Sequence, residues 1–303
     1  MTVWQAQDGE GWQAFEFTSA DGLRLFCRDY GDRRHAALPV LCLPGLTRSA
    51  RDFHDLALAL SRDPDHPRRV LSFEYRGRGR SAHDPDPANY NPVTEANDVL
   101  AGMTAAGIEK AAVVGTSRGG ILAMIVAVLR PGALGAVVLN DIGPEIDITG
   151  LLRIKGYVGK MATPRSFAEA ASILKLAQGK SFPALSDDDW MAFARATFRD
   201  EGGAPAIDYD PALMATVAEV SADAPPPSLW PQFEALKDLP VMVIRGEYSD
   251  ILAADTVARM AAAHPGLVGR EVAGQGHAPL LTDPVLNREI GDFIAAAEAK
   301  TAG

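Results

Sequence analysis

Short apolar runs rich in Val, Ile, Leu and Phe alternate along most of this chain with longer segments of helical period. This alternation constrains the fold strongly, because it is typical of a mostly parallel sheet that helices cover on both faces. It predicts strands at residues 14–18, 23–30, 39–43, 70–74, 111–115, 135–139, 240–245 and 267–272. It predicts helices at residues 50–60, 93–106, 118–129, 253–263 and 285–297. The predicted fold class is α/β, with an eight-stranded mostly parallel sheet flanked by helices.

The first two predicted strands are separated only by Ser19, Ala20, Asp21 and Gly22. An Asp-Gly pair favours a tight turn between antiparallel strands. We therefore expect an antiparallel hairpin before the parallel run begins.

The alternation stops between Ile142 and Leu239, where the pattern is helical and no convincing parallel strand occurs. Helices are expected at residues 150–161, 166–176, 186–197 and 229–236. Ser186, with Asp189 three residues later, is nearly a capping box and marks a helix start. The sequence thus predicts a core domain, residues 1–142 and 239–303, with an inserted helical domain, residues 143–238.

Charge and composition exclude several classes of protein. The chain has 29 basic and 39 acidic residues, and its formal charge of −10 disfavours binding to nucleic acid or to anionic membranes. Arg76, Arg78 and Arg80 alternate with glycines in a turn and do not line one helix face. The longest apolar run, Ile121 to Leu129, is too short to cross a bilayer.

The chain does not open with the pattern of a signal peptide, so we expect a cytoplasmic protein without a membrane partner. Cys27 and Cys42 lie in predicted strands and are expected to be buried, inert thiols and not a disulfide or metal site. The sequence carries no signal for an oligomeric state.

Gly115-Thr116-Ser117-Arg118-Gly119 joins a predicted buried strand to an apolar helix. A sharp turn between strand and helix lifts a serine hydroxyl out of the sheet, and the flanking glycines leave room for that turn. Ser117 is the predicted nucleophile. The alternative is an ordinary turn in which Ser117 caps the helix.

A serine hydroxyl needs a positioned base before it can attack a carbonyl carbon. His277 follows the last predicted strand, on a loop that can overhang the sheet. His83 follows the arginine-rich turn and could also approach the site, but a solvated loop residue is the favoured interpretation. We therefore predict His277 as the base.

The base needs a carboxylate that fixes its tautomer. Asp250 lies just past the seventh predicted strand and is the favoured acid, while Asp141, past the sixth, is the competitor.

Backbone N–H groups of Leu46 and Arg118 are the predicted oxyanion donors. The Arg118 side chain either attracts an anionic group or, as we favour, pairs with a nearby carboxylate.

These features resemble the α/β-hydrolase superfamily over nearly the whole chain. The resemblance rests on the elbow at 115–119, the post-strand acid Asp250, the late His277, the turn at 74–81 and the helical insertion after the sixth strand. It implies a serine-dependent hydrolase without a metal or organic cofactor. Serine at 117 argues against the haloalkane dehalogenase and epoxide hydrolase branches, which use aspartate at the elbow.

The resemblance places a small-molecule substrate between the inserted domain and the sheet. Candidate lining residues are Trp190, Phe193, Trp230, Phe233 and Leu280. The favoured alternative is that most of them form the core of the insertion.

Cleavage of a small or medium carboxylic ester or lactone through an acyl-enzyme is the leading hypothesis. A carbon-carbon hydrolase acting on a diketone-type ring-cleavage product is the first alternative, although Thr116, Arg118 and Ala278 differ from the pattern usual in those enzymes. An acyltransferase would exclude water from the same intermediate. Outside enzymes, a non-catalytic ligand-binding protein with this fold would carry a broken triad.

Overall fold

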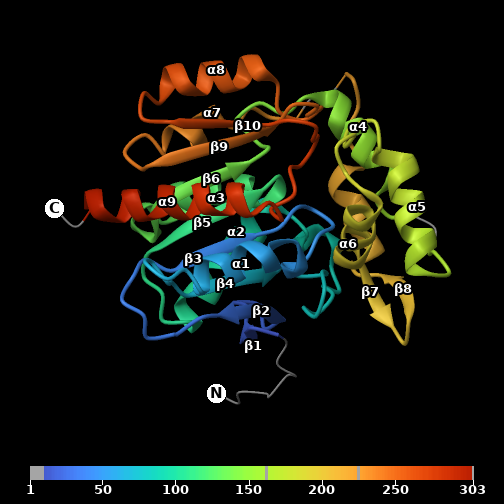
Figure 1. Ribbon diagram of the computed structural model, residues 1–303, viewed down its shortest axis with the longest axis horizontal. Coiled ribbons are helices and arrows are strands. Elements are labelled where there is room, and N and C mark those ends of the chain that lie inside the picture. Colours follow the sequence, from blue (N-terminus) through green and yellow to red (C-terminus); the bar gives the residue numbers. More distant parts are fainter. Residues whose placement is uncertain (1–9, 161–162, 224–225, 302–303) are drawn as a thin grey trace.

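The computed structural model describes residues 10–160, 163–223 and 226–301. Its main sheet has eight strands in the order β1-β2-β4-β3-β5-β6-β9-β10 (Figure 1). The strands are β1 (Trp12–Thr18), β2 (Arg24–Tyr30), β3 (Val40–Leu43), β4 (Val70–Glu74), β5 (Ala111–Thr116), β6 (Leu134–Asn140), β9 (Val241–Gly246) and β10 (Val268–Val272). All the predicted strands are present, with only small differences at their ends.

The sheet is parallel except at β2, which runs antiparallel to both β1 and β4. The β1–β2 connection closes through a hydrogen bond from Gly22 N–H to Ser19 O (3.0 Å). Gly22 has φ +90°, a conformation that glycine adopts without strain. The predicted antiparallel hairpin is confirmed.

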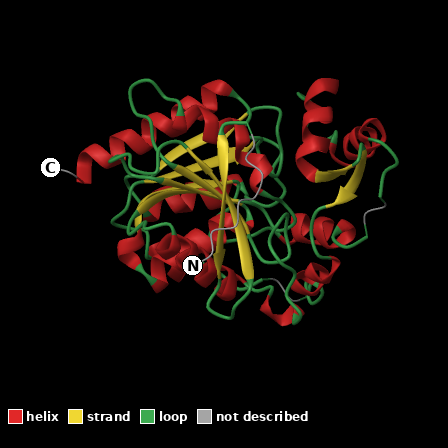
Figure 2. Ribbon diagram, turned by 90° about the horizontal axis from the view of Figure 1, so that it is seen from below, coloured by secondary structure: helices red, strands yellow, loops and turns green. Residues whose placement is uncertain are grey.

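Helices cover both faces of the sheet (Figures 1 and 2). One face packs against α1 (His54–Ser61) and α9 (Pro284–Thr301), and the other against α2 (Pro92–Ala105), α3 (Arg118–Leu129) and α8 (Ala254–Ala263). Successive side chains of β5 alternate between the two cores, because strand residues point to opposite faces. Both faces of the parallel strands are therefore apolar, as the sequence predicts.

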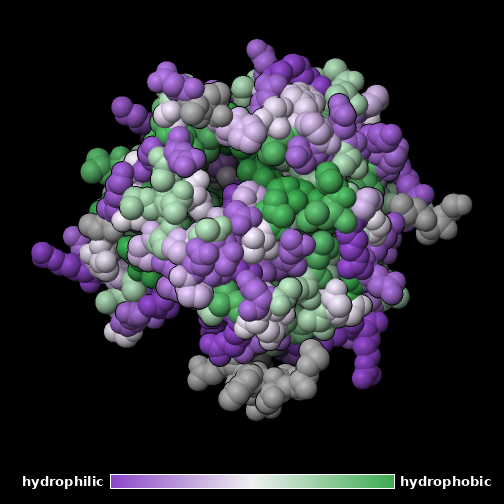
Figure 3. Space-filling model, turned by 180° about the vertical axis from the view of Figure 1, so that it is seen from behind, coloured by the Kyte–Doolittle hydropathy of each residue, from purple (hydrophilic) through white to green (hydrophobic). Residues whose placement is uncertain are grey.

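The longest apolar run of the sequence forms most of α3. Its inner residues pack against the sheet, while Val128 and Leu129 at its end stay exposed. Figure 3 views the molecule from the α2 and α3 side and shows hydrophobic side chains gathered in one area of a largely hydrophilic surface. No helix in the described ranges combines the length and the hydropathy that crossing a bilayer requires.

The inserted segment, residues 143–238, is not purely helical. It contains α4 (Ile148–Tyr157), α5 (Phe167–Gln178), α6 (Asp187–Thr197), an antiparallel hairpin of β7 (Phe198–Glu201) and β8 (Ala204–Ile207), and α7 (Trp230–Glu234). The sequence pattern predicts helices here and no parallel strand, and it does not predict this antiparallel hairpin (Figures 1 and 2). The helix predicted over 150–161 ends at Tyr157, and its last predicted residue, Met161, lies outside the described ranges.

The end of the inserted segment packs with the core. Phe233 and Leu236 are buried in the cluster that α2 and α3 form against the sheet. The division into a core domain and an inserted domain stays a prediction.

Both cysteines are buried and free, as predicted. Burial raises the pKa of the Cys27 thiol and of the Cys42 thiol. Because the thiolate is the reactive form, these side chains act as small apolar core residues.

Candidate active site

Ser117 lies at a sharp turn between β5 and α3. Its backbone has φ +51° and ψ −112°, a strained conformation for a residue with a side chain. The Ser117 N–H donates to Asn140 O on the neighbouring β6 (3.0 Å), which fixes the turn against the sheet. The strand, turn and helix therefore present the serine side chain at the carboxyl end of β5.

Two glycines of the motif are required because any side chain at these positions would clash with neighbouring backbone. A Cβ atom on Gly119 would lie 1.9 Å from Leu43 O, and one on Gly115 would lie 2.5 Å from the backbone of Gly119. Both distances are shorter than real contacts. Only glycine at both positions allows α3 to start this close to β3 and β5.

The Ser117 side chain makes no capping hydrogen bond to α3. Its Oγ lies 2.9 Å from His277 Nε2 instead. The alternative of a helix-capping serine is therefore wrong, and the structure brings together the residues predicted as nucleophile and base. His83, the other histidine weighed for this role, has an exposed side chain that lies near Asp210.

His277 is held from its other side by Asp141, whose Oδ2 lies 2.8 Å from Nδ1. A carboxylate only accepts hydrogen bonds, so Nδ1 carries the proton and Nε2 is free to accept from the Ser117 hydroxyl. The imidazole side chain is 8% exposed and thus largely shielded from water. The three side chains form one hydrogen-bonded chain.

Asp141 is fully buried at the end of β6 and has φ +57°, which Asp tolerates better than most residues. Its Oδ1 accepts from the N–H of Gly246 (2.8 Å), and its Oδ2 accepts from the Ser249 hydroxyl (2.6 Å) as well as from His277. These donors replace the water that the carboxylate loses on burial.

The predicted pairing of Asp250 with His277 is wrong. Asp250 forms a bidentate ion pair with Arg153 of α4. Arg153 Nε donates to Oδ2 (2.5 Å), and Arg153 Nη2 donates to Oδ1 (2.8 Å). Burial raises the pKa of Asp250, but the hydrogen bonds and charge of Arg153 outweigh burial and lower it. Asp250 therefore attaches the inserted segment to the loop after β9 and leaves the histidine to Asp141.

The strand order explains why Asp141, and not Asp250, contacts His277. β6 lies between β5 and β9, so its end is next to the strand that carries Ser117. After β9 the chain turns toward α4, where Asp250 O accepts the N–H of Gly150 (3.0 Å). Ser249 and Asn140 were not predicted as site residues, because only the folded chain brings their contacts together.

Asn140 joins the serine turn to the histidine loop. Its side-chain Nδ2 donates to Thr116 Oγ1 and to Pro279 O, each at 3.0 Å. Its main-chain carbonyl oxygen accepts from Ser117 N–H. Its Oδ1 is buried without a hydrogen-bond partner among the described residues. One residue thus holds both loops in register.

The loop of Leu46 passes directly beside Ser117. A Cβ atom placed on Gly45 would lie 3.9 Å from Ser117 Cβ. The hydrogen bonds of the described backbone include none donated by Leu46 N–H or Arg118 N–H. The loop is supported from behind, where Tyr75 Oη donates to Pro44 O (3.2 Å) and Arg78 Nε donates to Leu46 O (2.8 Å).

The Arg118 side chain forms the predicted ion pair with a carboxylate. Its Nε donates to Oε2 of Glu95 (2.7 Å), which is fully buried on α2. Burial raises the pKa of Glu95, but the guanidinium groups of Arg118 and Arg78 outweigh burial and lower it. Glu95 is therefore ionised, and the two arginines share its charge.

A cavity of about 580 Å³ opens above Ser117 and His277. Its wall comes from the core and from the inserted segment. Of the predicted lining residues, Phe193 and Leu280 line it. Other apolar or aromatic lining residues are Leu46, Ile154, Tyr157, Leu174, Tyr209 and Leu281.

Trp190, Trp230 and Phe233 are not among the described lining residues, so these predictions are wrong. Trp190 is buried in the separate core of the inserted segment, where its ring packs edge-on against Phe182. Trp230 packs against Phe233, and its indole Nε1–H donates to Glu145 (2.6 Å). Aromatic side chains at helical spacing here form core, which periodicity alone does not separate from a pocket wall.

A family model described as "Alpha/beta hydrolase family" matches residues 40–287. The chain belongs to the alpha/beta hydrolase family. A 3-hydroxybutyrate-oligomer hydrolase of Cupriavidus necator is 31% identical over 268 residues, covering 86% of this chain and 89% of that protein.

Solved structures agree with this membership. An alpha/beta hydrolase from Novosphingobium aromaticivorans is 40% identical, with a TM-score of 0.86 over 96% of this chain and 99% of that chain. A protein from Rickettsia typhi described as a "Putative Hydrolase" is 26% identical, with a TM-score of 0.81 over 94% of this chain and 99% of that chain. The predicted superfamily and fold class are confirmed, and the protein is a hydrolase by family.

Proposed function

We propose that this alpha/beta hydrolase cleaves a carboxylic ester or lactone through an acyl-enzyme on Ser117. The observation that carries the proposal is the hydrogen-bonded chain from Ser117 through His277 to Asp141. This chain contains the three roles that acyl transfer by serine requires: nucleophile, base and orienting acid. Asp141 replaces Asp250 as the proposed acid.

In the first half-reaction, Ser117 Oγ attacks the carbonyl carbon while His277 Nε2 takes the hydroxyl proton. The negative charge that forms on the carbonyl oxygen is stabilised by the N–H groups of Leu46 and Arg118. His277 then gives its proton to the leaving alkoxide, the carbon–oxygen bond breaks, and an alcohol departs. Asp141 stabilises the imidazolium that exists between these steps.

In the second half-reaction, water attacks the acyl-enzyme as His277 removes one of its protons. The same N–H groups hold the second oxyanion. His277 returns the proton to Ser117 Oγ, and a carboxylic acid leaves. The net reaction adds one water across the ester bond, and for a lactone it opens the ring to a hydroxy acid.

An ester substrate is supported by the cavity and by the relatives. A volume of about 580 Å³ is in the range of small-molecule sites, and most of the surface of its wall is apolar. The relative named as a 3-hydroxybutyrate-oligomer hydrolase makes short esters of hydroxy acids the first substrates to test. We also propose that residues 143–238 act as the domain that covers this cavity.

A labelling experiment tests the nucleophile. A fluorophosphonate probe should label the wild type and not Ser117→Ala, while Ser172→Ala, which removes an exposed hydroxyl on α5, should be labelled like the wild type. Turnover of p-nitrophenyl esters, lactones and 3-hydroxybutyrate dimer should fall by roughly 10⁴ to 10⁶ in Ser117→Ala.

The same panel separates the alternatives. Absence of labelling at Ser117 would refute the proposal and favour a non-catalytic binding protein. Labelling with turnover of a ring-cleavage diketone and no ester turnover would favour the carbon-carbon hydrolase. Ester turnover that yields transfer to an added alcohol in preference to water would favour the acyltransferase.

A further inference from the structure

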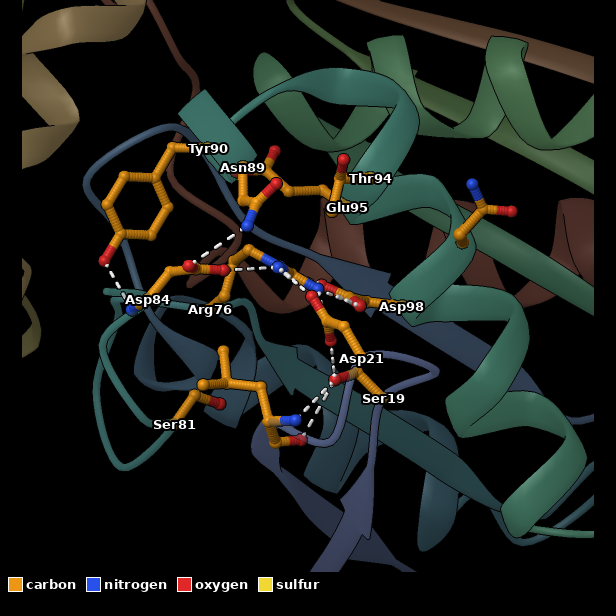
Figure 4. A network of polar contacts seen from close by, with 12 residues as sticks. Ser19, Asp21, Arg76, Ser81, Asp84, Asn89, Tyr90, Thr94, Glu95 and Asp98 are labelled. Atoms are coloured by element: carbon orange, nitrogen blue, oxygen red, sulfur yellow. Dashed lines mark hydrogen bonds and ion pairs between the residues drawn. The ribbon is translucent and has the colours of Figure 1, made fainter. Parts of the chain in front are cut away.

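A buried carboxylate lies between the two segments that carry the proposed oxyanion donors. Glu95 of α2 is fully buried, and its two oxygens are each 2.7 Å from a different arginine: Oε1 from Arg78 Nη1 and Oε2 from Arg118 Nε. Figure 4 shows Glu95 on the same helix as Asp98, which faces Arg76. The two acids thus form neighbouring buried ion pairs with the same arginine-rich turn.

The contacts continue from Glu95 to both donors. Arg78 Nε donates to Leu46 O at 2.8 Å, and Arg118 directly follows Ser117. A chain of polar contacts therefore runs from Leu46 through Arg78 and Glu95 to Arg118. It joins two loops that are more than 70 residues apart in the sequence.

We propose that Glu95 and Arg78 are positioning residues of the oxyanion hole, which fix the separation of the Leu46 and Arg118 N–H groups. The inference rests on the proposed serine mechanism. Oxyanion donors act only when they lie within hydrogen-bond distance of the oxygen in the transition state, so a small displacement of either loop is costly. α2 supplies the rigid element to which both loops are attached.

A positioning role and a purely electrostatic role for Glu95 predict opposite effects of Glu95→Gln on transition-state binding. The cluster of two arginines and one glutamate carries a net charge of +1, and Glu95→Gln would raise it to +2. More positive charge near the oxyanion would bind the transition state more tightly if charge alone mattered. If Glu95 acts by position, the same variant binds the transition state less tightly.

The experiment uses an alkyl trifluoromethyl ketone that matches the best ester. Ser117 Oγ adds to its carbonyl carbon, the hydroxyl proton moves to His277, and the carbonyl oxygen becomes an oxyanion in the proposed hole. Inhibition constants for this ketone and for the product acid, together with kcat and KM, are measured for the wild type, Glu95→Gln and Asp98→Asn. Asp98 is the matched control, since it is buried on α2 and pairs with Arg76 at 2.7 Å.

We expect Glu95→Gln to weaken ketone binding and lower kcat by about 10- to 100-fold, while KM and product binding change less than about threefold. Asp98→Asn should lower thermal stability and leave the ratio of ketone to product affinity unchanged. A ratio that is equal in both variants, or tighter ketone binding in Glu95→Gln, would overturn the inference.

Arg78→Lys is the second variant, in case Glu95→Gln does not fold. It keeps the positive charge, but one ammonium cannot span both Glu95 and Leu46 O as the guanidinium does. The same selective loss of ketone affinity is expected, and its absence would also overturn the inference. If wild-type protein neither reacts with the ketone nor is labelled by fluorophosphonate, the proposed function fails, which is a result separate from equal ratios in a reactive enzyme.

Discussion

At the scale of single residues, Asp141 and Asp250 differ in what surrounds their carboxylates. Asp141 accepts hydrogen bonds from Gly246, Ser249 and His277, whereas Asp250 is paired with Arg153. Asp141→Asn would place an amide group, which also carries N–H donors, against the donors Gly246 N–H, Ser249 Oγ–H and His277 Nδ1–H. It would favour the His277 tautomer with the proton on Nε2, which cannot accept the proton of Ser117. We therefore expect its kcat/KM to fall by about 10³ to 10⁴, measured on the best ester.

The control for this prediction is Asp250→Asn, whose kcat/KM should stay within about threefold of the wild type because the residue does not contact His277. Melting temperatures of both variants show whether the fold is kept. A larger loss of activity in Asp250→Asn than in Asp141→Asn would contradict the assignment of the acid.

The sequence was informative at this scale where the requirement is local. Ser117 and His277 could be predicted because an elbow and a late loop are visible in the residue order. The prediction favours the wrong acid, because Asp141 and Asp250 both follow strands and differ only in the tertiary contacts of their carboxylates. Ser249, next to Asp250, contributes to the site through a hydroxyl that no motif identifies.

At the scale of elements, α4 is attached to the loop after β9 by the Arg153–Asp250 pair. The two side chains are 32% and 28% exposed, so solvent screens the pair and its contribution to stability is modest. Asp250→Asn should lower the free energy of unfolding at pH 7 by about 0.5–1 kcal/mol, measured by urea unfolding.

The pH dependence of this loss follows from the lowered pKa of Asp250. A carboxylate whose pKa is lower in the folded state stabilises the fold above its ordinary value of 3.8. That contribution disappears as the pH falls through the folded value. The stability difference between wild type and Asp250→Asn should therefore be constant from pH 7 to 5 and shrink below pH 4, roughly, whereas a pH-independent difference would contradict the ion pair.

Elements could be predicted where they are long and patterned. The strands of the main sheet and the start of α6, where Ser186 and Asp189 form a capping box, follow from the sequence. The β7–β8 hairpin does not, because its strands have four residues each and only two of their eight residues are buried. The strand order could not be predicted from the sequence either, although it determines which carboxylate contacts His277.

At the scale of the whole molecule, several positive charges are inside the protein. The buried arginines are Arg68, Arg69, Arg76 and Arg78. The alternation of Arg76, Arg78 and Arg80 with glycines predicts a turn, but it does not show that two of these guanidinium groups are buried. Each of these arginines is paired with a carboxylate: Arg68 with Glu298, Arg69 with Asp29, Arg76 with Asp98 and Arg78 with Glu95.

Arg76 joins three parts of the core. Its guanidinium contacts Asp21 in the β1–β2 turn (2.8 Å), Asp84 (2.5 Å) and Asp98 on α2 (2.7 Å), as Figure 4 shows. The side chains of Asp84 and Asp98 are 3% and 5% exposed. Removing the arginine would leave two buried carboxylates without a cation.

We therefore expect Arg76→Met to lower the free energy of unfolding by about 3–5 kcal/mol in urea titrations at pH 7. The control is Arg270→Met, which removes an ion pair with Glu289 whose side chains are 44% and 38% exposed, and which should cost less than about 1 kcal/mol. Arg76→Lys should fall between them, because an ammonium keeps the charge but cannot contact all three carboxylates in the same geometry. Equal losses in Arg76→Met and Arg270→Met would mean that the buried carboxylates find other partners, and that Arg76 does not hold the β1–β2 hairpin to α2.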